Sequence, residues 1–196
     1  MIKVEFDFNE LTQYAQRFGA SVEQIPYALM LSLNRAAETT RELLIRQTWP
    51  SHVHQRNASF IAASLTTRDA RATKTSLSVE IYDRLDRGNL QMQSKGGTKT
   101  PHGGSNIAVP LSSIPKGSRG VPARLRPKAL GNRAIRKGDA LYARLPNGKL
   151  QLLYTLKHAT KIPKRVPMYE DFALSMQREL TRNIPLAVAQ AMKTRR

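Results

Sequence analysis

The chain has 196 residues, enough for one domain with a hydrophobic core, and a second full domain is not expected. It carries 32 Lys and Arg against 14 Asp and Glu, a formal charge of +18 that is typical of proteins that meet polyanions. No cysteine occurs, which excludes disulfide frameworks and thiolate zinc sites, and no apolar run approaches the roughly 20 residues that span a bilayer. The first residues lack the pattern of a signal peptide, so we expect a protein made in a cytoplasm, without a membrane partner.

The N-terminal part of the chain predicts a strand and two helices. Alternating apolar and polar residues at 2–8 predict a strand with one buried face, and a short helix is expected at 9–18. The dominant element is a helix over 25–48, where apolar residues recur at spacings of three and four. Pro26 suits its first turn, and Pro50 is expected to end it. Its apolar side is wide, so we expect two partners, for example a sheet and a neighbouring subunit.

The remaining elements are mostly strands. A short helix is predicted at 60–65, and alternation predicts a strand at 77–82. Strands at 141–145 and 149–156 flank Pro146-Asn147-Gly148, whose turn chemistry predicts a hairpin. Together with the long helix, these elements predict an α+β fold in which a small, mostly antiparallel sheet packs against that helix.

A last helix is predicted to begin near Met168. Glu170 and Asp171 lie in its first turn, where negative charge complements the helix dipole. We expect Pro185 to kink or break this helix, after which the helical apolar pattern continues to Met192.

The composition changes sharply between residues 87 and 138. This window contains eleven Lys and Arg, no Asp or Glu, and nine of the eleven glycines. Such a segment buries too little apolar surface to offset its ordering entropy, so we predict an extended basic loop or arm, ordered only where it contacts something. Residues 107–111 could form an edge strand within it, because Pro110 is not tolerated in a central strand. We therefore expect a single domain over 1–196, with 87–138 as its long basic loop.

The candidate contact residues are cations of this window. Aromatic side chains for base stacking are almost absent, so contacts with nucleic acid would be to phosphates and independent of sequence. The sequence leaves open whether these cations contact DNA or the acidic surfaces of neighbouring proteins. The candidates are Lys116, Arg119, Arg124, Arg126, Lys128, Arg133, Arg136 and Lys137.

No catalytic pattern accompanies these cations. The sequence has no Gly-x-Ser-x-Gly elbow and no obvious carboxylate pair. His52 and His54 have the spacing of one strand face, but they lack cysteine or adjacent acidic ligands, so we interpret them as solvated loop residues. The segment 96–100 lacks the first glycine of a phosphate loop. We therefore expect no enzymatic activity, no metal and no cofactor.

Several short segments follow one another in a suggestive order along the chain, with the basic window between the first and the second. They are Leu33-Asn34-Arg35-Ala36-Ala37, Leu145-Pro146-Asn147-Gly148-Lys149, Ile162-Pro163-Lys164-Arg165-Val166-Pro167-Met168 and Ile184-Pro185-Leu186. In these segments, mainly within 25–48 and 139–192, the chain resembles the minor tail protein Z family of long-tailed phages, whose members act in tail completion.

The resemblance implies a non-enzymatic virion protein at the head-proximal end of the tail, acting in head-tail joining. Through this resemblance the chain is similar to proteins that form sixfold rings. The resemblance therefore implies a homohexamer that is assembled in the host cytoplasm. The implied neighbours are tail terminator or tube proteins and head connector proteins. Such a ring encloses the DNA path, which gives the positive charge a partner, and we expect 87–138 to become ordered only in the ring.

Two other classes remain as alternatives. A basic RNA-binding or ribosome-associated protein would carry such charge and such a glycine-rich segment equally naturally, although it explains the C-terminal hairpin and helix less well. An enzyme acting on nucleic acid would need a carboxylate cluster, for which the sequence gives no sign.

Overall fold

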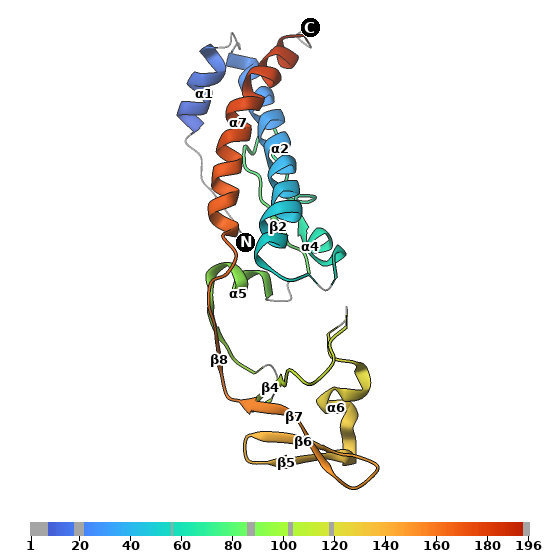
Figure 1. Cartoon of the computed structure of the whole chain (residues 1–196). Coiled ribbons are helices and arrows are strands. Elements are labelled where there is room, and N and C mark those ends of the chain that lie inside the picture. The colour runs from blue at the N-terminus through green and yellow to red at the C-terminus, as the bar shows by residue number, and fades with distance from the viewer. Residues whose placement is uncertain are drawn as a thin grey trace. The chain divides into compact units, whose positions relative to one another are not determined.

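A computed structural model describes residues 8–17, 22–55, 57–85, 89–101, 104–117 and 120–193. The predicted α+β class is confirmed, because small antiparallel sheets accompany a long helix and a C-terminal helix (Figure 1). The chain divides into two compact units, whereas we expected a single domain. Unit 1 comprises Met1–His54, Ser59–Ser94 and Arg165–Arg196, and unit 2 comprises Gln55–Ala58 and Lys95–Lys164.

Unit 1 is built on two long helices, α2 (Ile25–Leu43) and α7 (Met168–Lys193), which pack along each other (Figure 1). The predicted short helix is α1 (Phe8–Arg17), which contacts both, and a 3₁₀ turn, η1 (Val22–Gln24), precedes α2. The strand predicted at 2–8 lies outside the described residues, apart from Phe8, which begins α1.

The long N-terminal helix continues past Pro50, so the predicted stop is wrong. A π-helical turn, η2 (Leu44–Thr48), follows α2 and leads into α3 (Trp49–His52). The helical run ends at Val53, whose φ of −129° and ψ of 123° are extended. Only two residues of the run follow Pro50, so the hydrogen bond that its missing N–H removes is one of the last in the run.

The core of unit 1 lies mainly between α2 and α7. One cluster joins Leu33 and Leu44 to Phe172 and Met176, and a second joins Leu29 to Ile184, Val188 and Ala15. The helix α4 (Ser59–Ser64) adds Ile61 to the first cluster. These contacts use the wide apolar side of α2 within the chain, since Met30, Leu31, Leu43 and Ile45 also pack on the two clusters.

A two-stranded antiparallel sheet packs into the same core. It pairs β1 (Leu65–Thr66) with β2 (Tyr82–Asp83), and its Leu65 belongs to the cluster that contains Leu33 of α2. The predicted strand 77–82 is therefore present mainly as its last residue. Before Tyr82, Ile81 forms a single bridge and the Glu80 N–H donates a 3.0 Å hydrogen bond to the Ala70 carbonyl. The ladder itself is short because β1 is only two residues long.

Helix α7 does not break at Pro185 but is continuous to Lys193. Ile184, Ala187 and Val188 are fully buried in the cluster with α1 and α2. Burial on both sides of the proline offsets the roughly 3 kcal/mol that an interior proline costs a helix.

Unit 2 contains a four-stranded antiparallel sheet in the order β4-β7-β6-β5 (Figure 1). Its strands are β4 (Ile107–Pro110), β5 (Ala134–Lys137), β6 (Ala140–Arg144) and β7 (Leu150–Lys157). The predicted hairpin is confirmed by the pairing of β6 with β7 and by a 2.9 Å hydrogen bond from the Leu145 N–H to the Lys149 carbonyl. The proline-containing β4 lies at the sheet edge, as predicted.

Short helices cover one face of this sheet. They are η3 (Ala123–Leu125), α6 (Pro127–Leu130) and η4 (Gly131–Arg133), and we call residues 121–133 the covering layer. Leu130 and Ile114 pack there against Ala143, Leu153 and Tyr154. Elsewhere in the basic window lie α5 (Asn89–Lys95) and β3 (Gly97–Lys99), and β3 pairs with β8 (Thr160–Ile162).

The described part of the window 87–138 is therefore largely folded, whereas we expected an extended loop. The physical reason is that β4 and β5 pair with strands lying after the window, and β6 and β7 also supply apolar side chains that the window lacks. Composition within the window alone does not reveal this long-range pairing.

Candidate functional site

Positive charge is concentrated in the part of the chain that forms most of unit 2. Residues 95–164 contain fifteen Lys and Arg but a single acidic residue, Asp139, which gives +14 of the total formal charge of +18. The remainder of the chain, with 17 basic and 13 acidic residues, is close to balance. A surface so rich in one sign of charge attracts polyanions and raises their local concentration.

Seven of the eight candidate cations lie in the described part of unit 2, and all seven are exposed. The eighth, Arg119, lies outside the described residues. The seven come from consecutive pieces of the unit: the loop before the covering layer (Lys116), the covering layer itself (Arg124, Arg126, Lys128 and Arg133), and β5 (Arg136 and Lys137).

Backbone carbonyls hold two of these arginines. Arg126 donates through Nε to the Val121 carbonyl at 3.2 Å, and Arg136 donates through Nε to the Gly138 carbonyl at 3.1 Å. Each bond restrains the planar guanidinium. The N–H groups on the two terminal nitrogens of the guanidinium remain able to donate hydrogen bonds to an anion. Among the described residues, none of the seven cations forms an ion pair with a carboxylate. Their charge is therefore not neutralised locally.

The covering layer is fixed to the sheet by Tyr154. Its side chain is 2% exposed, and its hydroxyl donates a 2.7 Å hydrogen bond to the Leu125 carbonyl. Burial raises the pKa of Tyr154 above its ordinary value, and the positive charge of Arg126 opposes that shift. The phenol therefore stays neutral near pH 7 and keeps its proton for this bond.

The register of the sheet assigns the two β5 cations to different faces. Arg136 lies opposite Leu141, and Leu141 lies opposite Tyr154, so Arg136 projects on the side of the covering layer. Lys137 is the next residue and projects on the other side, since successive side chains in a strand alternate. Arg136 and the four cations of the covering layer are thus on the covered side, and Lys137 is separate from them. Lys116 lies two residues after Ile114, which packs under the covering layer.

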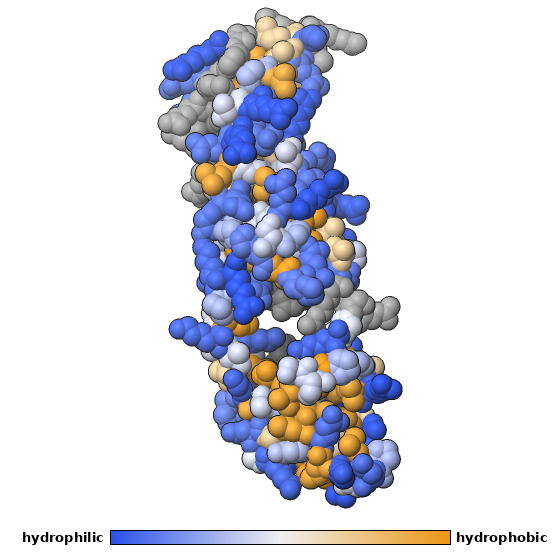
Figure 2. Space-filling model, in the orientation of Figure 1, coloured by the Kyte–Doolittle hydropathy of each residue, from blue (hydrophilic) through white to orange (hydrophobic). Residues whose placement is uncertain are grey.

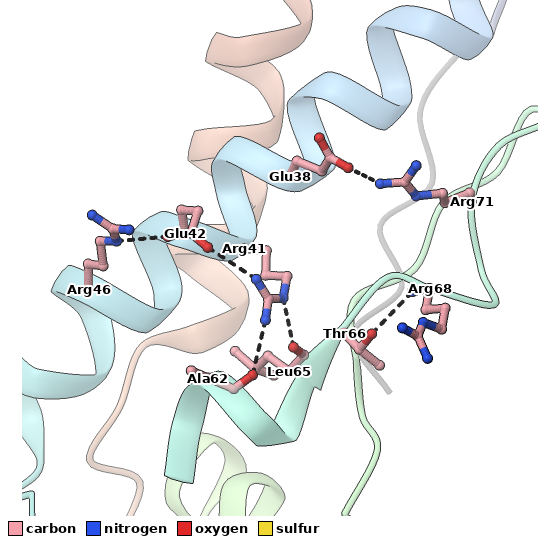
Figure 3. A network of polar contacts seen from close by, with 9 residues as sticks. All are labelled: Glu38, Arg41, Glu42, Arg46, Ala62, Leu65, Thr66, Arg68 and Arg71. Carbon is pink, nitrogen blue, oxygen red and sulfur yellow. Dashed lines mark hydrogen bonds and ion pairs between the residues drawn. The ribbon is translucent and has the colours of Figure 1, made fainter. Parts of the chain in front are cut away.

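A second polar cluster lies in unit 1, around Arg41 (Figure 3). Arg41 donates through Nε to the Leu65 carbonyl at 2.7 Å and through a terminal nitrogen to the Ala62 carbonyl at 3.0 Å. It also pairs with Glu42 at 3.1 Å, and Glu42 pairs with Arg46 at 2.7 Å. Arg41 thus joins α2 to α4 and β1, a role that the apolar spacing of residues 25–48 does not reveal.

This cluster borders an open pocket of about 570 Å³. The pocket is lined by side chains of both signs, among which Arg71 and Glu38 form an ion pair (Figure 3). Opposite charges in contact partly neutralise each other, so the pocket lacks the strong single-sign field of unit 2. The lining residues are Glu38, Arg41, Glu42, Thr66, Thr67, Arg68 and Arg71. We interpret the cluster as structural.

The histidines do not assemble a site in the described parts of the chain. His52 Nδ1 lies 2.8 Å from the Thr48 carbonyl, and His54 is exposed. Within those parts, no group of three or more His, Asp and Glu side chains is placed to hold a metal ion. None of the helices there is both long and apolar enough to cross a membrane.

The comparisons with known proteins identify no relative of this chain. No family model, no curated protein and no solved structure matches the chain. The resemblance to the minor tail protein Z family, which rests on short segments, therefore stays a prediction.

Proposed function

We propose that this chain is a structural virion protein that acts in tail completion, at the head-proximal end of a phage tail. The role is non-enzymatic and requires binding surfaces only. The observation that carries the proposal is the concentration of exposed cations in unit 2, seven of which have no carboxylate partner among the described residues. Support of a different kind comes from the order of segments that resembles the minor tail protein Z family.

In this proposal the covered side of unit 2 faces DNA. Lysine ammonium groups and arginine guanidinium groups there neutralise phosphates and release condensed counterions, which stabilises contact without reading base sequence. The candidate cations other than Lys137 make these contacts, and a ring of identical copies repeats them around the DNA path. Lys137 projects on the other face of the sheet. The proposed state is a homohexamer between tail tube or terminator proteins and head connector proteins.

Unit 1 contributes the contacts between copies in this proposal. Among the large apolar side chains that helix α7 exposes, the two most exposed are Leu174 at 63% and Leu186 at 56%. Exposed leucines are common singly on protein surfaces, but a neighbouring copy that covered both would gain roughly 25 cal/mol for each Å² of apolar surface removed from water.

A second candidate is a basic protein that binds nucleic acid without sequence preference, such as an RNA-binding or ribosome-associated protein. The charge of residues 95–164 favours it as much as it favours the first proposal. The two proposed functions place the protein in different particles, either virions or ribosomes and other RNA-protein particles. Fractionation of infected cells, followed by detection of the chain in each fraction, distinguishes between them.

Deletion of the gene from a phage that encodes this chain tests the proposal. We expect tails to form and heads to fill with DNA, but joined particles to be scarce in electron micrographs, with complementation by the intact gene restoring them. Normal numbers of joined, infective particles without the chain would contradict the proposal. Recovery of the chain in ribosomal fractions, and not in virions, would favour the second candidate.

A further inference from the structure

The four-stranded sheet of unit 2 has a second face, opposite the covering layer, which we call the open face. It is defined by six apolar residues: Ile107, Val109, Ile135, Tyr142, Leu150 and Leu152. The proposed DNA contacts lie largely on the other side of the sheet, so the proposed function does not explain this face.

The strand register puts these side chains together. Ile135 lies opposite Tyr142, and Tyr142 lies opposite Leu152, so three adjacent strands contribute one apolar row. Alternation places all three on the face away from Leu141 and Tyr154, which pack under the covering layer. Val109 lies opposite Thr155, and Thr155 lies opposite Ala140. Ala140 is two residues before Tyr142 and so projects on the same face, which places Val109 on that face as well.

A bulge in β7 adds one more apolar side chain to the covered face of the sheet than strict alternation would give. The register shifts between Leu141 and Tyr142, which lie opposite Tyr154 and Leu152 respectively, so Leu153 is the extra residue. Leu153 is 2% exposed and joins the cluster under the covering layer. The bulge therefore lets Leu153 and Tyr154 both contribute to the covered core, while Leu152 and Leu150 remain on the open face.

The open face is not part of the buried cores. None of its six residues belongs to the hydrophobic clusters that the described residues form, and Leu150 is 38% exposed. Figure 2 shows apolar surface gathered over the part of unit 2 that contains the sheet. The other five residues are half-buried, so the six together form a contiguous, partly exposed apolar surface. Such a surface marks an interaction site more often than scattered single residues do.

Cations border this apolar surface at three strand ends. Lys137 pairs with Ala140, Arg144 with Leu150, and Lys157 with Ile107, so all three project on the open face. The four strands contain no Asp or Glu. An apolar centre with a charged border is the usual anatomy of a protein interface.

Charge complementarity selects the occupant. A second copy docking through the same face would oppose cations to cations, which costs free energy. Nucleic acid binding on a sheet uses several aromatic side chains for base stacking, and the open face offers only Tyr142. We propose that the open face docks another protein, whose surface presents apolar side chains bordered by Asp and Glu. This inference does not require the proposed function, because any acidic protein partner satisfies it.

Photo-crosslinking in the full-length chain tests the inference. Leu152 is replaced by the crosslinker p-benzoylphenylalanine, the chain is produced in infected cells, and the crosslinked peptides are identified by mass spectrometry. The same crosslinker at Lys128, on the covering layer, is the control position. We expect Leu152 to give a crosslink to a different protein, at a segment with excess Asp and Glu, and its yield to fall as salt is raised.

A pair of charge-reversal variants tests the border. Lys137→Glu, Arg144→Glu and Lys157→Glu together are expected to lower the Leu152 crosslink roughly tenfold, since each rim charge contributes modestly to association. The matched control combines Lys116→Glu, Arg124→Glu and Lys128→Glu, which changes the charge equally but leaves the open face intact, and its yield is expected to stay within about twofold, because these charges lie away from the docked surface.

Four results would overturn the inference: a Leu152 crosslink to a second copy, a crosslink to nucleic acid, no crosslink to any protein, or an equal loss in both variants. If the border variant does not fold, the salt dependence of the crosslink in the otherwise unchanged chain decides the question, and a yield independent of salt would refute charge complementarity. None of these outcomes bears on whether joined phage particles require the chain, so the proposed function is tested separately.

Discussion

The hydroxyl of Tyr154, on β7, donates a 2.7 Å hydrogen bond to the backbone carbonyl of Leu125, in the covering layer. The two residues are 29 positions apart, and the segment between them contains four of the candidate cations on the layer side. Arg124 and Arg126 flank the accepting carbonyl directly. One buried phenol thus helps to position charges that the composition alone would have left on a mobile arm.

Replacement of Tyr154 by Phe tests this positioning. The variant keeps the ring but leaves the Leu125 carbonyl without this donor, and we expect a loss of roughly 1 kcal/mol in the stability of the layer. Hydrogen exchange of residues 121–130 should become faster by a factor of about 5, because 1 kcal/mol corresponds to that ratio. Tyr142→Phe is the control, since Tyr142 lies on the open face. Unchanged protection in Tyr154→Phe would show that the bond does not hold the layer.

The same phenol predicts a dependence on alkaline pH. Burial raises the pKa of Tyr154 above its ordinary value of 10.0, so the unfolded chain loses this proton at lower pH than the folded chain does. The stabilisation is complete below pH 10 and declines as pH rises through and beyond that value. Urea unfolding from pH 8 to pH 11 should therefore show a steeper decline for the natural chain than for Tyr154→Phe. Parallel declines would contradict a titration of Tyr154 in this range.

The buried hydroxyl pair between α2 and α7 predicts a non-additive result. Thr40 and Ser175 lie with their oxygens 2.8 Å apart, and both are almost fully buried. Thr40→Val alone removes one partner and should cost roughly 1–3 kcal/mol, because the Ser175 hydroxyl is left unsatisfied. Adding Ser175→Ala should recover part of that loss. Additive costs of the two single variants in a double-mutant cycle of unfolding free energies would argue against the pair.

Arg41 should matter more to stability than its neighbour Arg46. Arg41→Met removes two charge-assisted bonds to the Leu65 and Ala62 carbonyls, and we expect a cost of roughly 2–3 kcal/mol. Arg46→Met removes only a surface pair with Glu42, in which the arginine side chain is 79% exposed, and should cost less than about 1 kcal/mol. Thermal unfolding of the two variants compares these values. Equal costs would contradict the structural role of Arg41.

Local patterns in the sequence were sufficient for some elements. The hairpin around Pro146-Asn147-Gly148 was predictable because its turn chemistry and both strands lie within a short segment. Helix α2 was predictable from its apolar spacing, but its continuation beyond Pro50 depends on a π-helical turn that the spacing does not reveal. Helix α7 was expected to kink or break at Pro185, and it does not break there, since burial against α2 and α1 outweighs the local cost of proline.

The order of β4 and β5 in unit 2 could not be predicted from the sequence because it depends on nonlocal strand pairing. The strands β4 and β5 lie in a segment without acidic residues and become ordered by pairing with β7 and β6. The composition identified the candidate cations, but it did not reveal that Arg136 and Lys137 project on opposite faces. That distinction follows from the register of β5, and the open face depends additionally on the bulge at Leu153.

The most direct test of the proposed role replaces the seven candidate cations other than Lys137 by Ser or Gln and measures the fraction of joined, DNA-retaining particles in a phage that carries only the variant chain. We predict that the chain still folds and that rings and tails still assemble, while this fraction falls sharply, because the contacts between DNA and the layer are lost. Failure of rings or tails to assemble, with the chain folded, would mean that these cations bind neighbouring proteins. A normal fraction of DNA-retaining particles would contradict the claim that they contact DNA.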